Sequence, residues 1–163
     1  MKQLAIIWHS MTGGSQSLAK ACYNGARRAQ GVDVQMLNAA DAGAEHMLAA
    51  DGYIFVFPEN LAAISGGMKS FFDRCYYPCL GALNGRAYAM IVCAGSDGRN
   101  AVAQGERIAM GWRLRQIAES RIVCTHAQTS EAILAPKTIN EADQRAAADL
   151  GEQIATGLLM GIY

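Results

Sequence analysis

Hydroxyl groups and glycines are concentrated in one short stretch, residues 10–17, which reads Ser-Met-Thr-Gly-Gly-Ser-Gln-Ser. An apolar run, residues 4–8, precedes it, and a segment of good helix formers, residues 18–22, follows it. This order predicts a strand, a tight turn and a helix. The first amides of a helix lack intrahelical partners, and the helix dipole places about half a positive charge there. We therefore expect an anion site made of helix amides and hydroxyl donors.

Three common anion-binding loops do not fit this stretch. The dinucleotide fingerprint requires Gly-x-Gly-x-x-Gly, but Gly13 and Gly14 are adjacent and no third glycine follows at that spacing. A nucleoside triphosphate loop requires Gly-Lys-Ser or Gly-Lys-Thr, which occurs nowhere in the chain. A phosphoacceptor site requires a carboxylate after the first strand, where Trp8 and His9 stand. The loop also has no lysine or arginine, so it predicts a monophosphate held by neutral donors without a metal.

The rest of the chain alternates between segments typical of strands and of helices. We expect strands over residues 3–8, 32–37, 52–57, 87–94 and 121–125, the third ended by Pro58. We expect helices over residues 16–30, 67–76, 101–120 and 141–159, a weak helix or irregular segment over 39–50, and no clear element over 126–139. The alternation predicts an α/β fold with a doubly wound, five-stranded parallel sheet in the order 2-1-3-4-5 and helices on both faces.

Three polar or glycine-rich turns follow the first, third and fourth expected strands, over residues 9–15, 58–66 and 94–100. The carboxyl ends of parallel strands lie at one edge of a sheet, and ligands bind there at the point where the strand order reverses. The three turns are therefore expected to form one site.

Composition narrows the class of protein. The 163 residues are 52% hydrophobic and 17% charged, with a net charge of +0, which indicates one globular domain over residues 1–163 and no nucleic-acid partner. No apolar run has the length of a signal peptide or a membrane span, so we expect a cytoplasmic protein that does not insert into membranes, with its five cysteines reduced. Cys75 and Cys79 have no second Cys or His pair nearby, which disfavours a metal site.

Two blocks of the sequence resemble a known family. The run from Ser10 to Ser15 resembles the phosphate loop of flavodoxin-like proteins, Ser/Thr-x-Thr-Gly-x-Thr/Ser. Residues 51–58 with residues 65–74, which read Ser-Gly-Gly-Met-Lys-Ser-Phe-Phe-Asp-Arg, resemble the second block of NAD(P)H-dependent FMN oxidoreductases and WrbA-like quinone reductases. The resemblance extends over most of residues 3–125.

This resemblance implies FMN as the cofactor and NAD(P)H as a co-substrate. By position, the phosphate would be bound by Ser10, Thr12, Gly13, Gly14 and Ser15, and lined by Met11 and Gln16. The edge of the isoalloxazine ring would meet Pro58, Glu59, Asn60 and Leu61. Its other side, or the ribityl chain, would meet Gly95, Ser96, Asp97 and Gly98. A carboxylate of Glu59 that pointed inward would disfavour the anionic reduced flavin.

The ring loops depart from the flavodoxin pattern because residues 59–66 and 94–100 contain no aromatic side chain. One face of the flavin is then open to a nicotinamide or a quinone, or is covered by another chain in a homo-oligomer, with Tyr76, Tyr77 and Trp112 as candidates for that cover or for ordinary packing. The resemblance implies an oxidoreductase that passes electrons from NAD(P)H through FMN to a quinone or similar acceptor, with no catalytic side chain. The alternative is a flavodoxin-type electron carrier, against which the neutral charge argues.

Overall fold

A computed structural model covers residues 1–163 and contains one mixed sheet flanked by helices. The long strands are β1 (Lys2–Trp8), β2 (Val32–Asn38), β3 (Gly52–Asn60) and β5 (Ala87–Ala94), and the short ones are β4 (Ala63–Ile64), β6 (Arg115–Gln116) and β7 (Arg121–Cys124). The helices are α1 (Gly14–Ala26), α2 (Ala44–Ala49), α3 (Gly66–Tyr76), α4 (Arg99–Gly111), α5 (Ser130–Leu134) and α6 (Glu141–Leu159).

The sheet confirms the predicted strand order. Strands β2, β1, β3 and β5 lie side by side and pair in parallel. The fifth position is shared, because β6 pairs with the beginning of β5 and β7 pairs with its end, both in parallel. This arrangement is equivalent to the order 2-1-3-4-5, and the strand order reverses between β1 and β3. The one antiparallel addition is β4, which folds back on the end of β3 as a hairpin.

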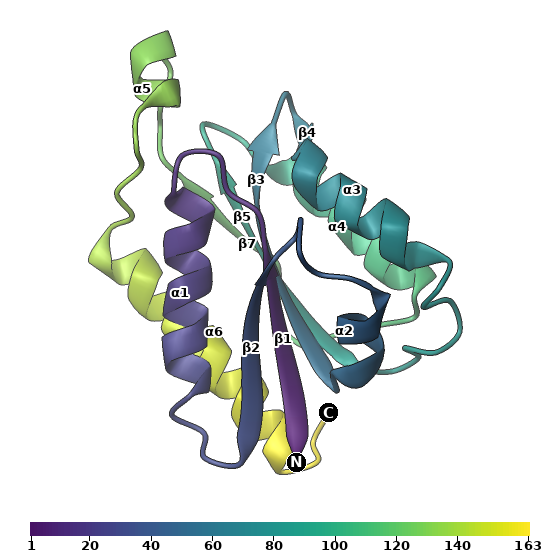
Figure 1. The fold of residues 1–163 in the computed structure, drawn as a ribbon. Coiled ribbons are helices and arrows are strands. Elements are labelled where there is room, and N and C mark those ends of the chain that lie inside the picture. Colours follow the sequence, from purple (N-terminus) through teal and green to yellow (C-terminus); the bar gives the residue numbers. More distant parts are fainter.

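Helices cover both faces of the sheet, as Figure 1 shows, with α1 and α6 on one face and α3 and α4 on the other. Successive residues of the central strands point to opposite faces, so each strand contributes to two cores. Ile54 and Ile91 lie in the core under α1 and α6, whereas Phe55 and Met90 lie in the core under α3 and α4. Because both faces are buried, the strands read as continuous apolar runs in the sequence.

Glycines allow α1 and α6 to approach closely. A Cβ atom on Gly25 would lie 1.8 Å from the carbonyl oxygen of Ala148, and one on Gly151 would lie 2.0 Å from that of Cys22. Each helix therefore presents a glycine to the backbone of the other. Although α6 is the longest helix, no helix of the structure has the length and apolar character needed to cross a bilayer.

The predicted helix over residues 101–120 is too long. Helix α4 ends at Gly111, and Arg113 adopts a left-handed conformation with φ of 55°. The reason is Trp112, which is fully buried: its indole Nε1 donates to the Tyr76 carbonyl at 3.0 Å, and its ring stacks on Tyr76 at 5.7 Å between centroids. The chain then turns into β6. Of the three aromatic residues considered as a cover for a neighbouring flavin, only Tyr77 is largely exposed.

The prediction that Pro58 ends the third strand is also wrong, because β3 continues to Asn60. Proline lacks the amide hydrogen that a residue of a central strand donates to the neighbouring strand. On this side, however, β1 has already ended at Trp8, which pairs with Val56. Pro58 thus lies where no neighbouring strand requires its N–H, and its carbonyl accepts a hydrogen bond from Ser65 at 3.2 Å.

Candidate functional site

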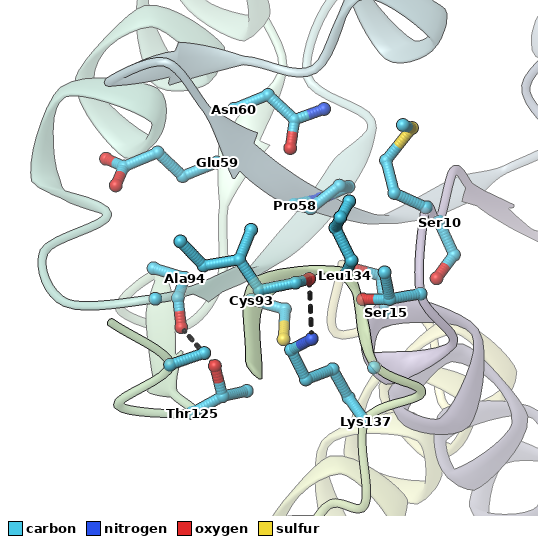
Figure 2. Close-up of a pocket in the computed structure, with 16 residues that line it drawn as sticks. Ser10, Ser15, Pro58, Glu59, Asn60, Cys93, Ala94, Thr125, Leu134 and Lys137 are labelled. Carbon is cyan, nitrogen blue, oxygen red and sulfur yellow. Dashed lines mark hydrogen bonds between the residues drawn. The ribbon is translucent and has the colours of Figure 1, made fainter. Parts of the chain in front are cut away.

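A cavity of about 180 Å³ opens at the carboxyl ends of β1, β3, β5 and β7, at the switch point of the sheet (Figure 2). Several predicted site residues line it together: Ser10, Met11, Thr12, Gly14, Ser15, Pro58, Glu59, Asn60 and Gly95. The other predicted residues do not line it: Gly13, Gln16, Leu61, Ser96, Asp97 and Gly98. Seven lining residues were not predicted: Cys93, Ala94, Thr125, Ala127, Ile133, Leu134 and Lys137.

The loop between β1 and α1 has the geometry of an anion-binding turn. Gly13 precedes the helix with φ of 95°, a left-handed conformation that favours glycine, and its amide donates to Ser10 Oγ at 3.0 Å. Helix α1 therefore begins directly at the cavity, and no side chain caps its first turn. The uncapped amides and the positive end of the helix dipole are available to an anion.

Ser15 provides a second, independent indication of a ligand here. The residue is 1% exposed and lines the cavity, and its Oγ is the only buried side-chain oxygen or nitrogen without a hydrogen-bond partner. Burying an unpaired hydroxyl is unfavourable, so such groups usually have a partner. An anion in the cavity would accept a hydrogen bond from Ser15. The Ser15 hydroxyl would then act as one of the neutral donors expected of a phosphate loop.

The second wall of the cavity is the hairpin of β3 and β4. Pro58, Glu59 and Asn60 line the cavity, but Glu59 points away from the phosphate loop in Figure 2, and its Oε2 accepts a hydrogen bond from the Gly98 amide at 2.8 Å. Its carboxylate thus connects two of the predicted ring loops. Leu61 occupies the tip of the hairpin and is fully exposed, at 101% of its reference area.

The third loop, after β5, reaches the cavity only with Gly95. Ser96 and Asp97 are exposed, and Asp97 pairs with the Nε of Arg99 at 2.6 Å, a hydrogen bond that lowers the pKa of the Asp97 carboxyl. Gly98 is buried and precedes α4 with φ of 87°. These residues shape the loop rather than line the cavity.

His9 joins the end of β1 to the start of α3. Its Nδ1 lies 2.8 Å from Ser65 Oγ, and a Cβ on Gly67 would lie 2.5 Å from the His9 ring. Burial lowers the pKa of His9. His9 does not line the cavity.

Most of the lining residues that were not predicted from the sequence belong to the segment after β7. This segment contains the short helix α5, which Figure 1 shows beyond the carboxyl edge of the sheet on the side of α1. Ile133 and Leu134 present apolar side chains to the cavity although they are 52% and 77% exposed. Lys137 also lines the cavity, and its backbone amide donates to the Thr12 carbonyl at 2.8 Å. The phosphate loop itself has no cation, and Lys137 is the cationic residue among those that line the cavity.

Two signals could have found some of these residues. Cys93, Ala94 and Thr125 end the predicted strands 87–94 and 121–125, so the rule that placed the turns at the carboxyl edge also applies to them. Thr129 accepts a hydrogen bond from the Ala132 amide at 3.2 Å, so α5 carries an N-cap residue readable in the sequence. Nothing in the sequence indicates that Lys137 pairs with Thr12, because that contact depends on the tertiary fold.

Comparisons with known proteins agree with this architecture. The model of the family described as "NADPH-dependent FMN reductase" matches residues 17–129. A protein of Aquifex aeolicus (strain VF5) named flavodoxin is 32% identical over 104 residues, which are 63% of this chain and 56% of that protein, so the match spans little more than half of the relative.

Solved structures confirm the flavodoxin-like fold. A flavodoxin from the domain Archaea superposes with a TM-score of 0.77 at 16% identity, covering 96% of this chain and 99% of that one. A flavodoxin, WrbA-like protein from Agrobacterium tumefaciens gives a TM-score of 0.69 at 16% identity, with 98% and 99% covered. The loop of residues 10–15 and the residue Lys137 lie outside the range that the family model matches.

Proposed function

The chain belongs to the NADPH-dependent FMN reductase family, and on this premise we propose that it binds FMN at the carboxyl edge of its sheet and transfers electrons through it as a flavodoxin-type carrier. The observation that supports FMN binding best is the unpartnered, buried hydroxyl of Ser15 at the uncapped start of α1. FMN carries a phosphate that this group and the α1 amides would bind, and the flavin supplies the redox chemistry when bound.

The residues of the site have positioning roles in this proposal. Ser10 shapes the phosphate loop through Gly13, and Ser15 and Thr12 would donate hydrogen bonds to the phosphate. The cavity is smaller than the roughly 300–1,000 Å³ of typical ligand pockets, so it accommodates only part of the cofactor. The ring would extend along the β3–β4 hairpin, where Asn60 and Pro58 provide backbone and side-chain contacts. The Glu59 carboxylate is engaged by the Gly98 amide and points away from the phosphate loop, which would weaken the expected like-charge effect on the reduced flavin.

Two comparisons support different functions for the FMN site. The flavodoxin of Aquifex aeolicus, at 32% identity, favours the carrier. The description of the matching family favours a second candidate function, in which the protein oxidises NADPH or NADH and reduces a quinone-like acceptor. Both functions would use the same FMN site.

Anaerobic spectroscopy separates the two functions. The FMN-loaded protein would be mixed with NADPH or NADH, and the visible flavin absorbance would be followed. A carrier keeps its colour with either nicotinamide, loses it with dithionite, and then reduces a one-electron acceptor such as cytochrome c. Rapid bleaching by NADPH, followed by turnover with a quinone, would instead establish the reductase. A protein that binds no FMN at micromolar concentration would overturn both.

A further inference from the structure

Lys137 is the only cationic side chain among the residues that line the cavity. Its backbone amide donates to the Thr12 carbonyl, which fixes Lys137 to the phosphate loop. Its Nζ donates to three carbonyl oxygens of the α5 region, those of Ala132 at 2.7 Å, Ile133 at 2.8 Å and Ala135 at 2.6 Å. Figure 2 shows Lys137 at the lower wall of the cavity, with one of its hydrogen bonds as a dashed line.

The backbone and the Cβ of Lys137 lie close to the start of α1, where the anion is expected. The Cβ of Lys137 is 3.4 Å from the position that a Cβ on Gly14 would occupy, and the Sγ of Cys93 is 2.8 Å from the same position. Burial raises the pKa of the Cys93 thiol to about 11, and the charge of Lys137 and an interaction with the Ser15 hydroxyl oppose this rise. Gly14, Cys93 and Lys137 therefore surround the same end of the cavity as the unpartnered Ser15 hydroxyl.

The present acceptors of the ammonium are replaceable. Helix α5 has no buried residue, so water can satisfy its carbonyl groups once the lysine leaves them. The ammonium already makes charge-assisted hydrogen bonds with the α5 carbonyls, but a phosphate carries negative charge and adds the attraction of an ion pair to such a bond. The flexible four-carbon stem of lysine allows the ammonium to change partners. The other charged group of the cavity, Glu59, is engaged by the Gly98 amide and does not compete.

We propose that Lys137 makes the site selective for phosphorylated flavin, because its ammonium leaves the α5 carbonyls and donates to the terminal phosphate of FMN. The proposal rests on the FMN binding proposed above and adds a residue outside the part of the chain that matches the family. Uncharged riboflavin would leave the ammonium on α5. The ratio of FMN affinity to riboflavin affinity is therefore the quantity that Lys137 controls.

The test compares both flavins in matched variants by quenching of flavin fluorescence on titration with protein. Lys137→Met removes the ammonium and keeps the aliphatic stem, and Lys20→Met, on the exposed side of α1, makes the same change of net charge. We expect Lys137→Met to weaken FMN binding roughly tenfold or more and to leave riboflavin binding unchanged. Lys137→Arg should retain most of the preference, and Lys20→Met all of it.

An equal loss of affinity for both flavins would show that Lys137 only holds α5 in place, and an unchanged ratio would also overturn the proposal. Acetylation of lysines in the wild-type protein, read by mass spectrometry, supplies a test that needs no variant. FMN should protect Lys137 from acetylation and riboflavin should not, so equal labelling with both flavins contradicts the proposal. If the wild type binds neither flavin, the proposed function itself fails.

Discussion

The carboxylate of Glu59 accepts a hydrogen bond from the backbone amide of Gly98 at 2.8 Å, which ties the β3–β4 hairpin to the turn before α4. The hairpin lines the cavity, and Gly98, in the turn before α4, supports it from outside the cavity. A second contact supports the first, because Asn100 Nδ2 donates to the Ala62 carbonyl at the tip of the same hairpin. The spacing of the two turns therefore depends on side chains of the turns themselves.

Glu59→Ala should weaken FMN binding and lower stability together. Loss of a hydrogen bond to a charged group costs about 1.5–3 kcal/mol, and the Gly98 amide would be left without its partner. Glu59→Gln keeps an acceptor at the same distance and should lose less than half as much. Isothermal titration with FMN and thermal unfolding without FMN measure the two effects. Equal behaviour of the two variants would show that the carboxylate acts by its charge and not as the acceptor for Gly98.

Ser15→Ala should separate ligand binding from stability. The Ser15 hydroxyl is buried and has no partner in hydrogen-bond geometry, and the neighbouring Cys93 thiol is only a weak hydrogen-bonding group, so removing the hydroxyl relieves a desolvation cost. We expect the free energy of unfolding without ligand to stay unchanged or to rise by up to about 1 kcal/mol. FMN affinity should fall about tenfold, because a hydrogen bond to the phosphate is lost.

The control for this prediction is Ser17→Ala, which removes a hydroxyl from the same helix outside the cavity. It should leave FMN affinity unchanged. An affinity that survives Ser15→Ala would show that the hydroxyl does not contact the ligand.

The strand order and the location of the site could be predicted from the sequence, because both follow from local patterns. Apolar runs such as 52–57 define the buried strands, and parallel pairing brings their ends to one edge. The boundaries of the elements were less predictable where tertiary contacts decide them. Trp112 ends α4 by burying its ring against Tyr76, and no pattern within residues 101–120 indicates this.

The part of the site beyond residue 125 could not be predicted for a similar reason. Helix α5 is short and has no buried face, so it leaves no hydrophobic period in the sequence. Lys137 reaches the phosphate loop through a backbone hydrogen bond to Thr12, and backbone contacts between distant segments have no sequence signature. Residues that face a cavity from such segments become visible only with the fold.

His9 should make stability depend on pH. Burial lowers its pKa below the ordinary value of 6.5, so the unfolded chain takes up a proton more readily than the folded protein. The contribution of His9 is fully present above pH 6.5 and is lost as the pH falls from 6.5 through the pKa of the folded state. Denaturant unfolding between about pH 5 and 8 should show this loss, and His9→Asn should reduce the slope. An unchanged slope in His9→Asn would assign the pH dependence to other groups.

Ala62→Gly should stabilise the hairpin. Leu61 and Ala62 form its two-residue turn with φ of 50° and 60°, the conformation of a type I′ turn, which favours Asn-Gly. A residue with a side chain costs roughly 1–2 kcal/mol in the left-handed conformation, and glycine avoids this cost. Part of the gain is lost because glycine also raises the conformational entropy of the unfolded chain. We expect a net gain of about 0.5–1 kcal/mol in urea denaturation. The adjacent Ala63→Gly, in β4, should instead lose about that much, and a loss in both variants would contradict the explanation.

Gly151→Ala should be strongly destabilising although the residue lies outside the site. A Cβ there would lie 2.0 Å from the Cys22 carbonyl oxygen. This oxygen belongs to the backbone of α1, so it cannot move away as a flexible side chain could. The helices would have to separate, and such overpacking costs about 1–3 kcal/mol, or a decrease in Tm of roughly 2–4 °C for each kcal/mol. Gly66→Ala is the matched control, because nothing lies within 4 Å of the added Cβ. It should leave Tm unchanged or raise it slightly. A similar Tm for the two variants would mean that α1 and α6 can move apart at little cost.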